Sequence, residues 1–192
     1  MTQWHWVRHG PTHEKNFVGW RDVPADLSNT DQISRLGSYL PQAAYVLSSD
    51  LIRASDTAKA IQGTRQNLGV FADIREFNFG AWDGLHFSEV AERDPDLSRQ
   101  FWEQPGDLAA PDGESWNAVA NRVGQFVDKM NALHPNNVFI AVAHIGVIMT
   151  QIQRASGSTA YQAMGHVIDN LSVTDMEFDG QNWRMGRINH RP

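Results

Sequence analysis

Gln3-Trp4-His5-Trp6-Val7-Arg8-His9-Gly10 is a short, mostly apolar run that ends in a polar triplet. Residues Gln3 to Arg8 predict a β-strand, and the triplet Arg8-His9-Gly10 lies at its end. A histidine in this place suits nucleophilic attack on phosphorus, because the arginine can bind phosphoryl oxygens and the glycine lets the backbone come close. Chance would produce the triplet in roughly a few per cent of chains this long, so its meaning depends on the residues that follow.

Composition indicates a globular protein. The chain has 192 residues, of which 41% are hydrophobic and 20% charged, enough for one well-buried domain and too few for two. We therefore assign residues 1–192 to a single domain. The sequence has no cysteine, which excludes disulfides, thiolate catalysis and cysteine-ligated metal centres and fits a reducing cytoplasm.

The charge balance bears on partners and location. The formal net charge of −6 at pH 7 argues against binding to nucleic acid or to an anionic membrane. Residues Met1 to Val7 contain no basic segment followed by an apolar stretch, and no apolar run has membrane-spanning length. We expect a soluble cytoplasmic protein, in which an anionic substrate would need a local cluster of arginines.

Predicted strands alternate with predicted helices along the chain. Strands are expected at Gln3 to Arg8, Tyr45 to Ser49, Val70 to Arg75 and Val138 to Ala143, before a closing hairpin of Val173 to Phe178 and Trp183 to Ile188. Helices are expected at Thr30 to Leu40, Arg53 to Gln66, Ser115 to Leu133 and Ile145 to Ala155. This alternation predicts an α/β fold, a three-layer sandwich with a mainly parallel central sheet.

Residues 77–112 interrupt this alternation. The segment holds turn-forming pairs such as Asp94-Pro95 and Pro105-Gly106, together with several aromatic side chains. We interpret it as a helical insertion, or lid, over the active-site face and not as a separate domain.

Five polar residues follow predicted strands, where ligands of open α/β sheets bind. They are Arg8, His9, Arg53, Glu76 and His144. Alone, each has a simpler interpretation, such as a helix residue, a surface carboxylate or a buried histidine. Their joint placement favours one shared site.

These residue types suit phosphoryl transfer without a metal. Two arginines can bind the non-bridging oxygens, and one neutral histidine can attack if its other ring nitrogen is held by a hydrogen bond. The second histidine can donate to a phosphoryl oxygen. Glu76 can protonate the leaving alkoxide and then, as carboxylate, activate the water that hydrolyses the phosphohistidine.

The chain resembles the histidine phosphatase superfamily, branch 1, the phosphoglycerate mutase-like branch, over nearly its whole length. The motifs that carry the resemblance are Arg8 to Thr12, Gly19 to Asp22 with Leu27-Ser28, Ser49 to Ala58, Glu76 to Gly84, Asp112 to Ser115 and Val142 to His144. The resemblance implies that His9 is phosphorylated, that Arg8, Arg53 and His144 bind phosphate, and that Glu76 is the proton donor and acceptor.

The resemblance has further implications. It implies that Thr12 supports the loop that carries His9, and that Glu114 and Ser115 are structural. We expect no metal and no cofactor, and a small phosphomonoester as the partner; a homodimer is left open as the assembly.

Two positions depart from the pattern of the family. Relatives often place an asparagine six residues after the nucleophile, but this position is Lys15 here and the asparagine is Asn16, so either residue is a candidate phosphate contact. The residue after the second histidine is commonly small, but here it is Ile145. A β-branched residue disfavours positive φ and adds bulk beside the phosphate.

Hydrolysis is the favoured activity. The segment Phe79 to Gly84 resembles that of α-ribazole phosphatases and broad-specificity phosphatases, and true mutases are typically longer. The alternatives are a cofactor-dependent phosphoglycerate mutase and a catalytically retired phosphate-sensing module. The substrate is left between α-ribazole phosphate and a sugar or glycolytic phosphate. Aromatic residues could present a surface to the leaving group or simply pack the insertion; they are Trp20, Trp82, Phe101, Trp102 and Trp116.

Overall fold

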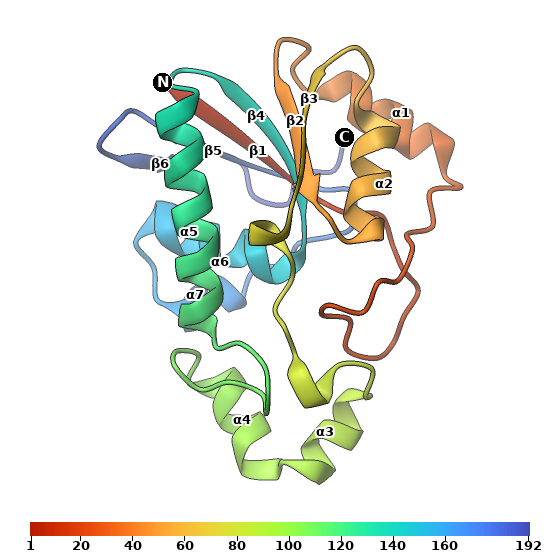
Figure 1. The fold of residues 1–192 in the computed structure, drawn as a ribbon, viewed down its shortest axis with the longest axis vertical. Helices are drawn as coiled ribbons and strands as arrows, with labels where there is room; N and C mark the ends of the chain where they lie inside the picture. Colours follow the sequence, from red (N-terminus) through yellow and green to blue (C-terminus); the bar gives the residue numbers. More distant parts are fainter.

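A six-stranded sheet forms the centre of the molecule in a computed structural model that describes all residues 1–192 (Figure 1). Its strand order is β3-β2-β4-β1-β5-β6. The strands are β1 (Thr2–Arg8), β2 (Tyr45–Ser49), β3 (Gln66–Phe71), β4 (Val138–Ala143), β5 (Val173–Phe178) and β6 (Trp183–Met185). Strands β1 to β4 pair in parallel, whereas β5 and β6 are antiparallel, which confirms the predicted α/β class with a mainly parallel sheet.

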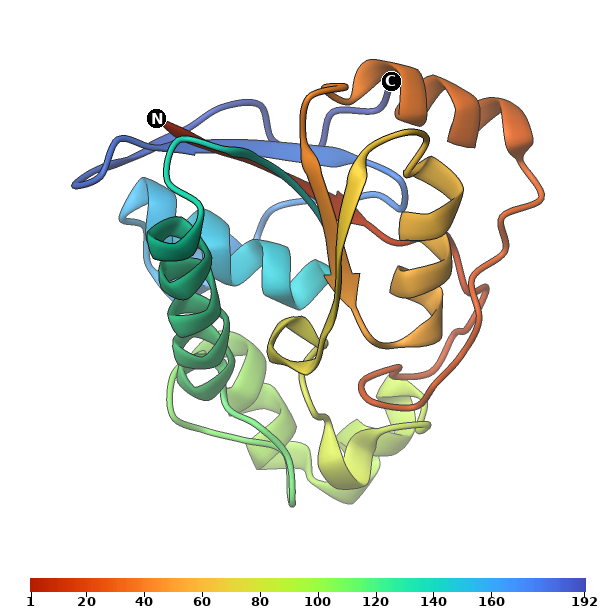
Figure 2. The same ribbon diagram turned by 45° about the horizontal axis from the view of Figure 1, so that its top comes forward.

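Helices cover both faces of the sheet. They are α1 (Thr30–Tyr39), α2 (Ile52–Ile61), α3 (Phe87–Arg93), α4 (Pro95–Glu103), α5 (Trp116–Leu133), α6 (Ile145–Ser156) and α7 (Ala160–Met164), with short 3-10 turns η1 (Ala72–Ile74) and η2 (Gly80–Trp82). Helices α1 and α2 lie on one side, and α5 and α6 on the other (Figure 2). No helix is both long enough and apolar enough to cross a bilayer.

The central strands are apolar on both faces because both faces are covered. In β4, Phe139 and Ala141 belong to the larger core cluster, which includes residues of α5 and α6, whereas Ile140 and Val142 belong to a second cluster with residues of α1 and α2. Alternate side chains of a strand point to opposite faces, so this nearly unbroken apolar run fills two cores at once.

The insertion lies beyond one end of the sheet, at the bottom of Figure 1. It contains η2, α3 and α4, and the fully buried Trp82 packs at its centre. The Trp82 indole N–H donates to Asp94 at 2.7 Å, and its ring meets Phe101 edge-on at 5.3 Å. Val90 and Phe101 belong to the same core cluster as Trp4 and Trp6 of β1. The assignment of residues 1–192 to one domain stays a prediction.

Several elements differ from those predicted, among them the closing strand, which ends at Met185 and not at Ile188. The helix expected at Arg53 to Gln66 ends at Ile61, since Gly63 takes a left-handed φ of 55° and turns the chain into β3. The extended segment expected at Val70 to Arg75 is the end of β3 followed by η1. Helix α7, a five-residue helix, was not predicted because it is too short to show helical periodicity.

Candidate active site

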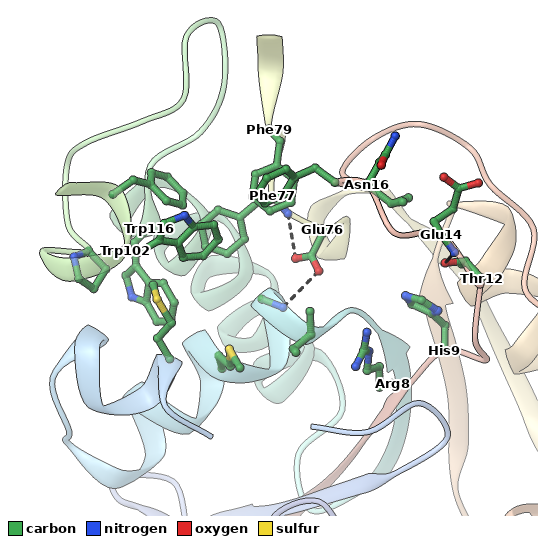
Figure 3. Close-up of a pocket in the computed structure, with 18 of the residues that line it drawn as sticks. Arg8, His9, Thr12, Glu14, Asn16, Glu76, Phe77, Phe79, Trp102 and Trp116 are labelled. Carbon is green, nitrogen blue, oxygen red and sulfur yellow. Dashed lines mark hydrogen bonds between the residues drawn. The ribbon is translucent and has the colours of Figure 1, made fainter. Parts of the chain in front are cut away.

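A cavity of about 500 Å³ lies where the sheet meets the insertion. Arg8 and His9 reach it from the end of β1, Arg53 from the first turn of α2, and Glu76 from the segment after η1. Figure 3 shows Glu76 between two ends of this cavity. We call them the polar end, with Arg8, His9, Thr12 and Glu14, and the aromatic end, with Trp102 and Trp116.

His9 is held as a neutral imidazole. Its Nδ1–H donates to the Gly10 carbonyl at 2.7 Å, which leaves the lone pair on Nε2. Burial, and then the neighbouring cations Arg53 and Arg8, lower the pKa of His9 to about 3. The ring is therefore uncharged near neutral pH and has one nitrogen able to act as a nucleophile.

Two side chains from distant segments position the loop that carries His9. Thr57 Oγ1 accepts from the Gly10 N–H at 3.0 Å and donates to the Arg53 carbonyl at 2.6 Å. Asn170 Nδ2 donates to the His9 carbonyl at 2.8 Å. The expected support, Thr12, lines the cavity, and its hydroxyl accepts a long hydrogen bond of 3.5 Å from the Glu14 N–H.

Sequence reasoning missed the roles of Thr57 and Asn170. Thr57 lies in the motif Ser49 to Ala58 but was given no role of its own, although its place one turn after Arg53 is a signal in retrospect. No local pattern marks Asn170.

Backbone carbonyls orient both arginines. Arg53 is 1% exposed, and its Nη1 and Nη2 donate to the carbonyls of Arg21 at 3.0 Å and Gly19 at 2.7 Å. Arg8 Nη1 donates to the Ile168 carbonyl at 2.6 Å, whereas its buried Nε has no partner in the protein. The two guanidinium groups thus lie beside His9 with fixed orientation, as recognition of an anion requires.

His144 lies beside His9 and is not among the side chains that line the cavity. It is fully buried at the N-terminus of α6, and its ring centroid is 5.1 Å from that of His9. Neither ring nitrogen has a hydrogen-bond partner in the protein. Burial, together with His9 and nearby arginines, lowers the pKa of His144 well below its ordinary value, so this ring is also neutral.

Glu76 is placed by two backbone amides. Its Oε1 accepts from the Phe77 N–H at 3.0 Å and its Oε2 from the Gly146 N–H at 3.2 Å, the dashed lines of Figure 3. The carboxyl group is buried, and burial raises its pKa more than these hydrogen bonds and the two arginines lower it. A raised pKa favours the protonated form that a general acid needs.

Gly146 leaves the room that the Glu76 carboxyl group occupies. A Cβ at Gly146 would collide with Glu76 Oε1 and would lie 2.5 Å from a Phe77 ring carbon. The requirement for a small residue therefore falls on Gly146, not on Ile145. Ile145 begins α6 without a positive φ, so its branched side chain meets no backbone conflict, and the bulk that it adds lines the cavity.

The structure separates Asn16 from Lys15. Asn16 lines the cavity, and its Nδ2 donates to the Gly84 carbonyl at 2.8 Å. Lys15 is exposed and does not line the cavity. Of the two candidates for a phosphate contact, Asn16 is therefore the one in reach of the site.

Glu114 and Ser115 have structural contacts. Glu114 Oε2 accepts from the Asn78 N–H at 2.9 Å and pairs with Arg122 at 2.8 Å, while Ser115 caps α5. Arg122 also donates to the carbonyls of Arg75 at 3.0 Å and Glu76 at 3.4 Å. Arg122, another residue that sequence reasoning missed, thereby holds the segment that carries Glu76.

Three of the five aromatic candidates line the cavity, namely Phe101, Trp102 and Trp116. Trp82 is buried behind them in the core of the insertion. The Trp20 indole N–H donates to the Glu76 carbonyl at 2.9 Å, and its ring lies 4.9 Å from the Arg75 guanidinium carbon. Phe17, Phe77 and Phe79 complete the aromatic lining and were not singled out from the sequence.

The polar side chains of the cavity make hydrogen bonds within the protein. Both oxygens of Glu76 already accept backbone N–H groups, and Nδ1 of His9 donates to a carbonyl. No three His, Asp or Glu side chains of the chain gather in a way that could hold a metal ion.

Comparison with known proteins identifies the family. The sequence matches the histidine phosphatase superfamily (branch 1) over residues 5–191. The chain belongs to this family. As a solved relative, Bacillus stearothermophilus YhfR superimposes with a TM-score of 0.89 at 25% sequence identity, over 99% of this chain and 98% of that one.

Two sequence relatives match most of this chain but differ in how much of their own length is matched. The bifunctional protein Rv2228c of Mycobacterium tuberculosis is 34% identical over 168 residues, which cover 86% of this chain but only 44% of that protein. The chain thus spans less than half the length of this relative. The metal-independent phosphoserine phosphatase of Arabidopsis thaliana is 32% identical over 193 residues, 92% of this chain and 76% of that protein.

Proposed function

We propose that this protein is a metal-independent phosphomonoester hydrolase that acts through a phosphohistidine at His9. The observation that carries the proposal is the arrangement of a neutral His9, two oriented arginines and a buried Glu76 with a raised pKa around one cavity. The metal-independent phosphatase among its relatives supports the same chemistry.

The first chemical step transfers the phosphoryl group to His9. The lone pair of His9 Nε2 attacks phosphorus while the bond from phosphorus to the ester oxygen breaks. Protonated Glu76 gives its proton to the departing alkoxide, so that the alcohol leaves uncharged. Arg8 and Arg53 bind the non-bridging oxygens and offset the charge that accumulates on them.

The second step regenerates the enzyme. Glu76, now a carboxylate, takes a proton from water, and the water oxygen attacks phosphorus. The bond from phosphorus to Nε2 breaks, its electron pair returns to His9, and inorganic phosphate leaves. Glu76 is thus the general acid when His9 is phosphorylated and the general base when the phosphohistidine is hydrolysed.

His144 is the histidine that we propose to contact the phosphoryl oxygens, whereas His9 is the nucleophile. Its ring is buried beside His9 with both nitrogens unpartnered by protein. A buried polar group without a partner is costly, and an N–H of a neutral imidazole can donate to a phosphoryl oxygen. Asn16 and Thr12 are secondary candidates at the same end of the cavity.

Hydrolysis is favoured over the alternatives on the residues present. A retired phosphate-sensing module would lack part of the machinery, but all five residues are present, with Arg8, His9, Arg53 and Glu76 around the cavity and His144 beside His9. A phosphoglycerate mutase would have to accept carboxylated substrates and shield the phosphoenzyme from water. A cytoplasmic location and a small phosphomonoester, such as α-ribazole phosphate or a sugar phosphate, remain part of the proposal.

Phosphate release from a panel of monoesters, with a chelator present, tests the proposal. We expect turnover by the wild-type protein and its loss in His9→Asn, together with an acid-labile, base-stable phosphate adduct that only the wild type forms. Isomerisation of 3-phosphoglycerate after addition of bisphosphoglycerate, without phosphate release, would make the protein a mutase. Phosphate binding without turnover or adduct would favour the sensing module.

A further inference from the structure

The aromatic end of the cavity is a wall of ordered rings beside the site of phosphoryl transfer. Phe17 and Trp102 lie nearly parallel, with centroids 6.0 Å apart and 11° between their planes. Phe77 and Phe79 are stacked in a similar way, at 5.9 Å and 15°. Each ring also packs against the larger core cluster, so the wall is in place before a ligand arrives.

The cationic side chains of the cavity are all at the polar end. Among its lining residues, Arg8 and Arg53 are the cations, and both are assigned to the transferred phosphoryl group. Lys15 and Arg21 are near in sequence but do not line the cavity, and Arg21 is paired with Glu14 at 3.3 Å and with Asp83 at 3.3 Å. No lining cation is therefore left for a second anionic group.

Glu14, the partner of Arg21, adds a carboxylate and not a cation to the cavity lining, so it does not favour a second anionic group. Its carboxylate lies above Thr12 at the polar end in Figure 3, and its side chain is 35% exposed. A carboxylate or second phosphate on the substrate would meet either Glu14 or the apolar wall. Burying an unpaired charge in apolar surroundings is strongly unfavourable.

We propose that the substrate is a monoester of a bulky apolar or aromatic alcohol that carries no second anionic group. This inference rests on the proposed function and narrows the substrate class of the same site, since it disfavours monoesters of polar alcohols such as sugars. A cavity of about 500 Å³ holds a phosphoryl group and a ring system together. The wall offers flat faces on which an aromatic leaving group stacks, and Glu14 selects against anionic ones.

A pair of alkyl phosphates tests the selection by charge. Glycerol 3-phosphate and 3-phosphoglycerate share a three-carbon skeleton and a primary phosphate ester, but the second carries a carboxylate. We expect kcat/KM to be at least ~10²-fold lower for 3-phosphoglycerate, the scale on which a site rejects a group that it cannot pair. Glu14→Gln should bring the kcat/KM values of the two esters closer together. Glu92→Gln, which removes an exposed carboxylate on α3, should leave their ratio unchanged.

A second comparison tests the apolar wall. We expect 2-naphthylmethyl phosphate, also a primary alkyl ester, to exceed glycerol 3-phosphate in kcat/KM by about tenfold or more. Trp102→Ala should reduce this preference by about tenfold, mainly through KM, because it removes contact surface and not a reacting group. Phe87→Ala is the matched control, since Phe87 is an exposed ring of the same insertion, outside the cavity.

The outcomes separate this inference from the proposed function. Hydrolysis of all three esters with equal kcat/KM, or a preference for 3-phosphoglycerate, would overturn the substrate class while leaving the phosphatase intact. Loss of hydrolysis for every ester, without a phosphohistidine, would overturn the proposed function. A ranking of naphthylmethyl over glycerol over glycerate esters, altered by Trp102→Ala and Glu14→Gln but not by their controls, would support the inference.

Discussion

The two ends of the cavity are built in different ways. The polar end combines residues that are far apart in the sequence, with His9 after β1, Arg53 at the start of α2 and Glu76 after η1. The aromatic end comes largely from residues 77–116, the insertion and the start of α5. The first depends on the sheet for its geometry, whereas the second depends on the packing of a local segment.

Because of this difference, we expect the polar end to determine the rate of phosphoryl transfer and the aromatic end to determine which esters are preferred. Because each polar side chain is fixed by backbone or hydroxyl partners, a small shift there should harm the turnover of every ester alike. The aromatic wall offers surface without directional bonds, so changes there should alter the ranking of esters. Each substitution below is therefore best measured with both glycerol 3-phosphate and 2-naphthylmethyl phosphate.

Glu76→Gln is expected to have the largest effect. Loss of the general acid should lower kcat/KM by about 10²–10⁴-fold for both alkyl esters. 4-Nitrophenyl phosphate, whose leaving group needs no proton, should lose far less in this step. Equal losses for the three esters would remove Glu76 from the acid role, and the melting temperature shows whether the amide is tolerated between two N–H donors.

The same substitution is expected to change how kcat/KM depends on pH. Burial raises the pKa of Glu76, so wild-type kcat/KM for alkyl esters should fall as the pH rises through this pKa and the carboxyl group loses its proton. The pKa of His9, about 3, keeps the nucleophile neutral over this range. Glu76→Gln should lack the alkaline decline, and a decline that persists unchanged would assign it to another group.

Arg53→Lys is expected to be nearly as damaging. It retains the positive charge but loses the planar fork that bonds two carbonyls and that we propose binds the phosphoryl group, so kcat/KM should fall by about 10²–10³-fold for both esters. Arg65→Lys is the matched control, because Arg65 is also buried and bonded to backbone carbonyls but lies outside the cavity. It should lower thermal stability and leave kcat/KM intact.

Gly146→Ala tests whether Glu76 is positioned by the start of α6. The added methyl group collides with the Glu76 carboxyl group and the Phe77 ring, so Glu76 must shift, and kcat/KM should fall by roughly 10²-fold. The double variant with Glu76→Gln should be no slower than Glu76→Gln alone. Additive losses would show that Gly146 acts by another route.

Thr57→Val is expected to have the smallest effect of these substitutions. It leaves the buried Gly10 N–H without its acceptor, which should cost about 1–3 kcal/mol in the free energy of unfolding, measured by urea denaturation. The kcat/KM of both esters should fall together as the His9 loop loosens. Thr57→Ser should restore both quantities, and a loss confined to the naphthylmethyl ester would contradict the division between the two ends.

Much of the polar end could be predicted from the sequence because the ends of buried strands can be recognised in it. Apolar runs such as Val138–Ala143 mark buried strands, and a parallel sheet brings their carboxyl ends to one edge. Arg8, His9, Arg53 and Glu76 line one cavity as this argument expects. Helix α2 was predicted too long because a glycine turn leads directly into β3, and helical periodicity does not reveal where such a turn falls.

The supporting contacts could not be predicted in the same way. Thr57, Asn170 and Arg122 act through hydrogen bonds to residues that are 47, 161 and 46 positions away in the sequence, and such bonds leave no periodic pattern. The concern over Ile145 arose from the same limit, since only the geometry places the need for a small residue at Gly146.

The sequence by itself determined the α/β class, the family and the residue types of the site, since these follow from hydrophobic periodicity and short motifs. Tertiary structure alone decided the tautomer of His9, the raised pKa of Glu76 and the charge balance of the cavity. These properties depend on burial and on which distant groups come within a few ångströms. Desolvation and hydrogen bonding act through space, and only the folded chain defines those distances.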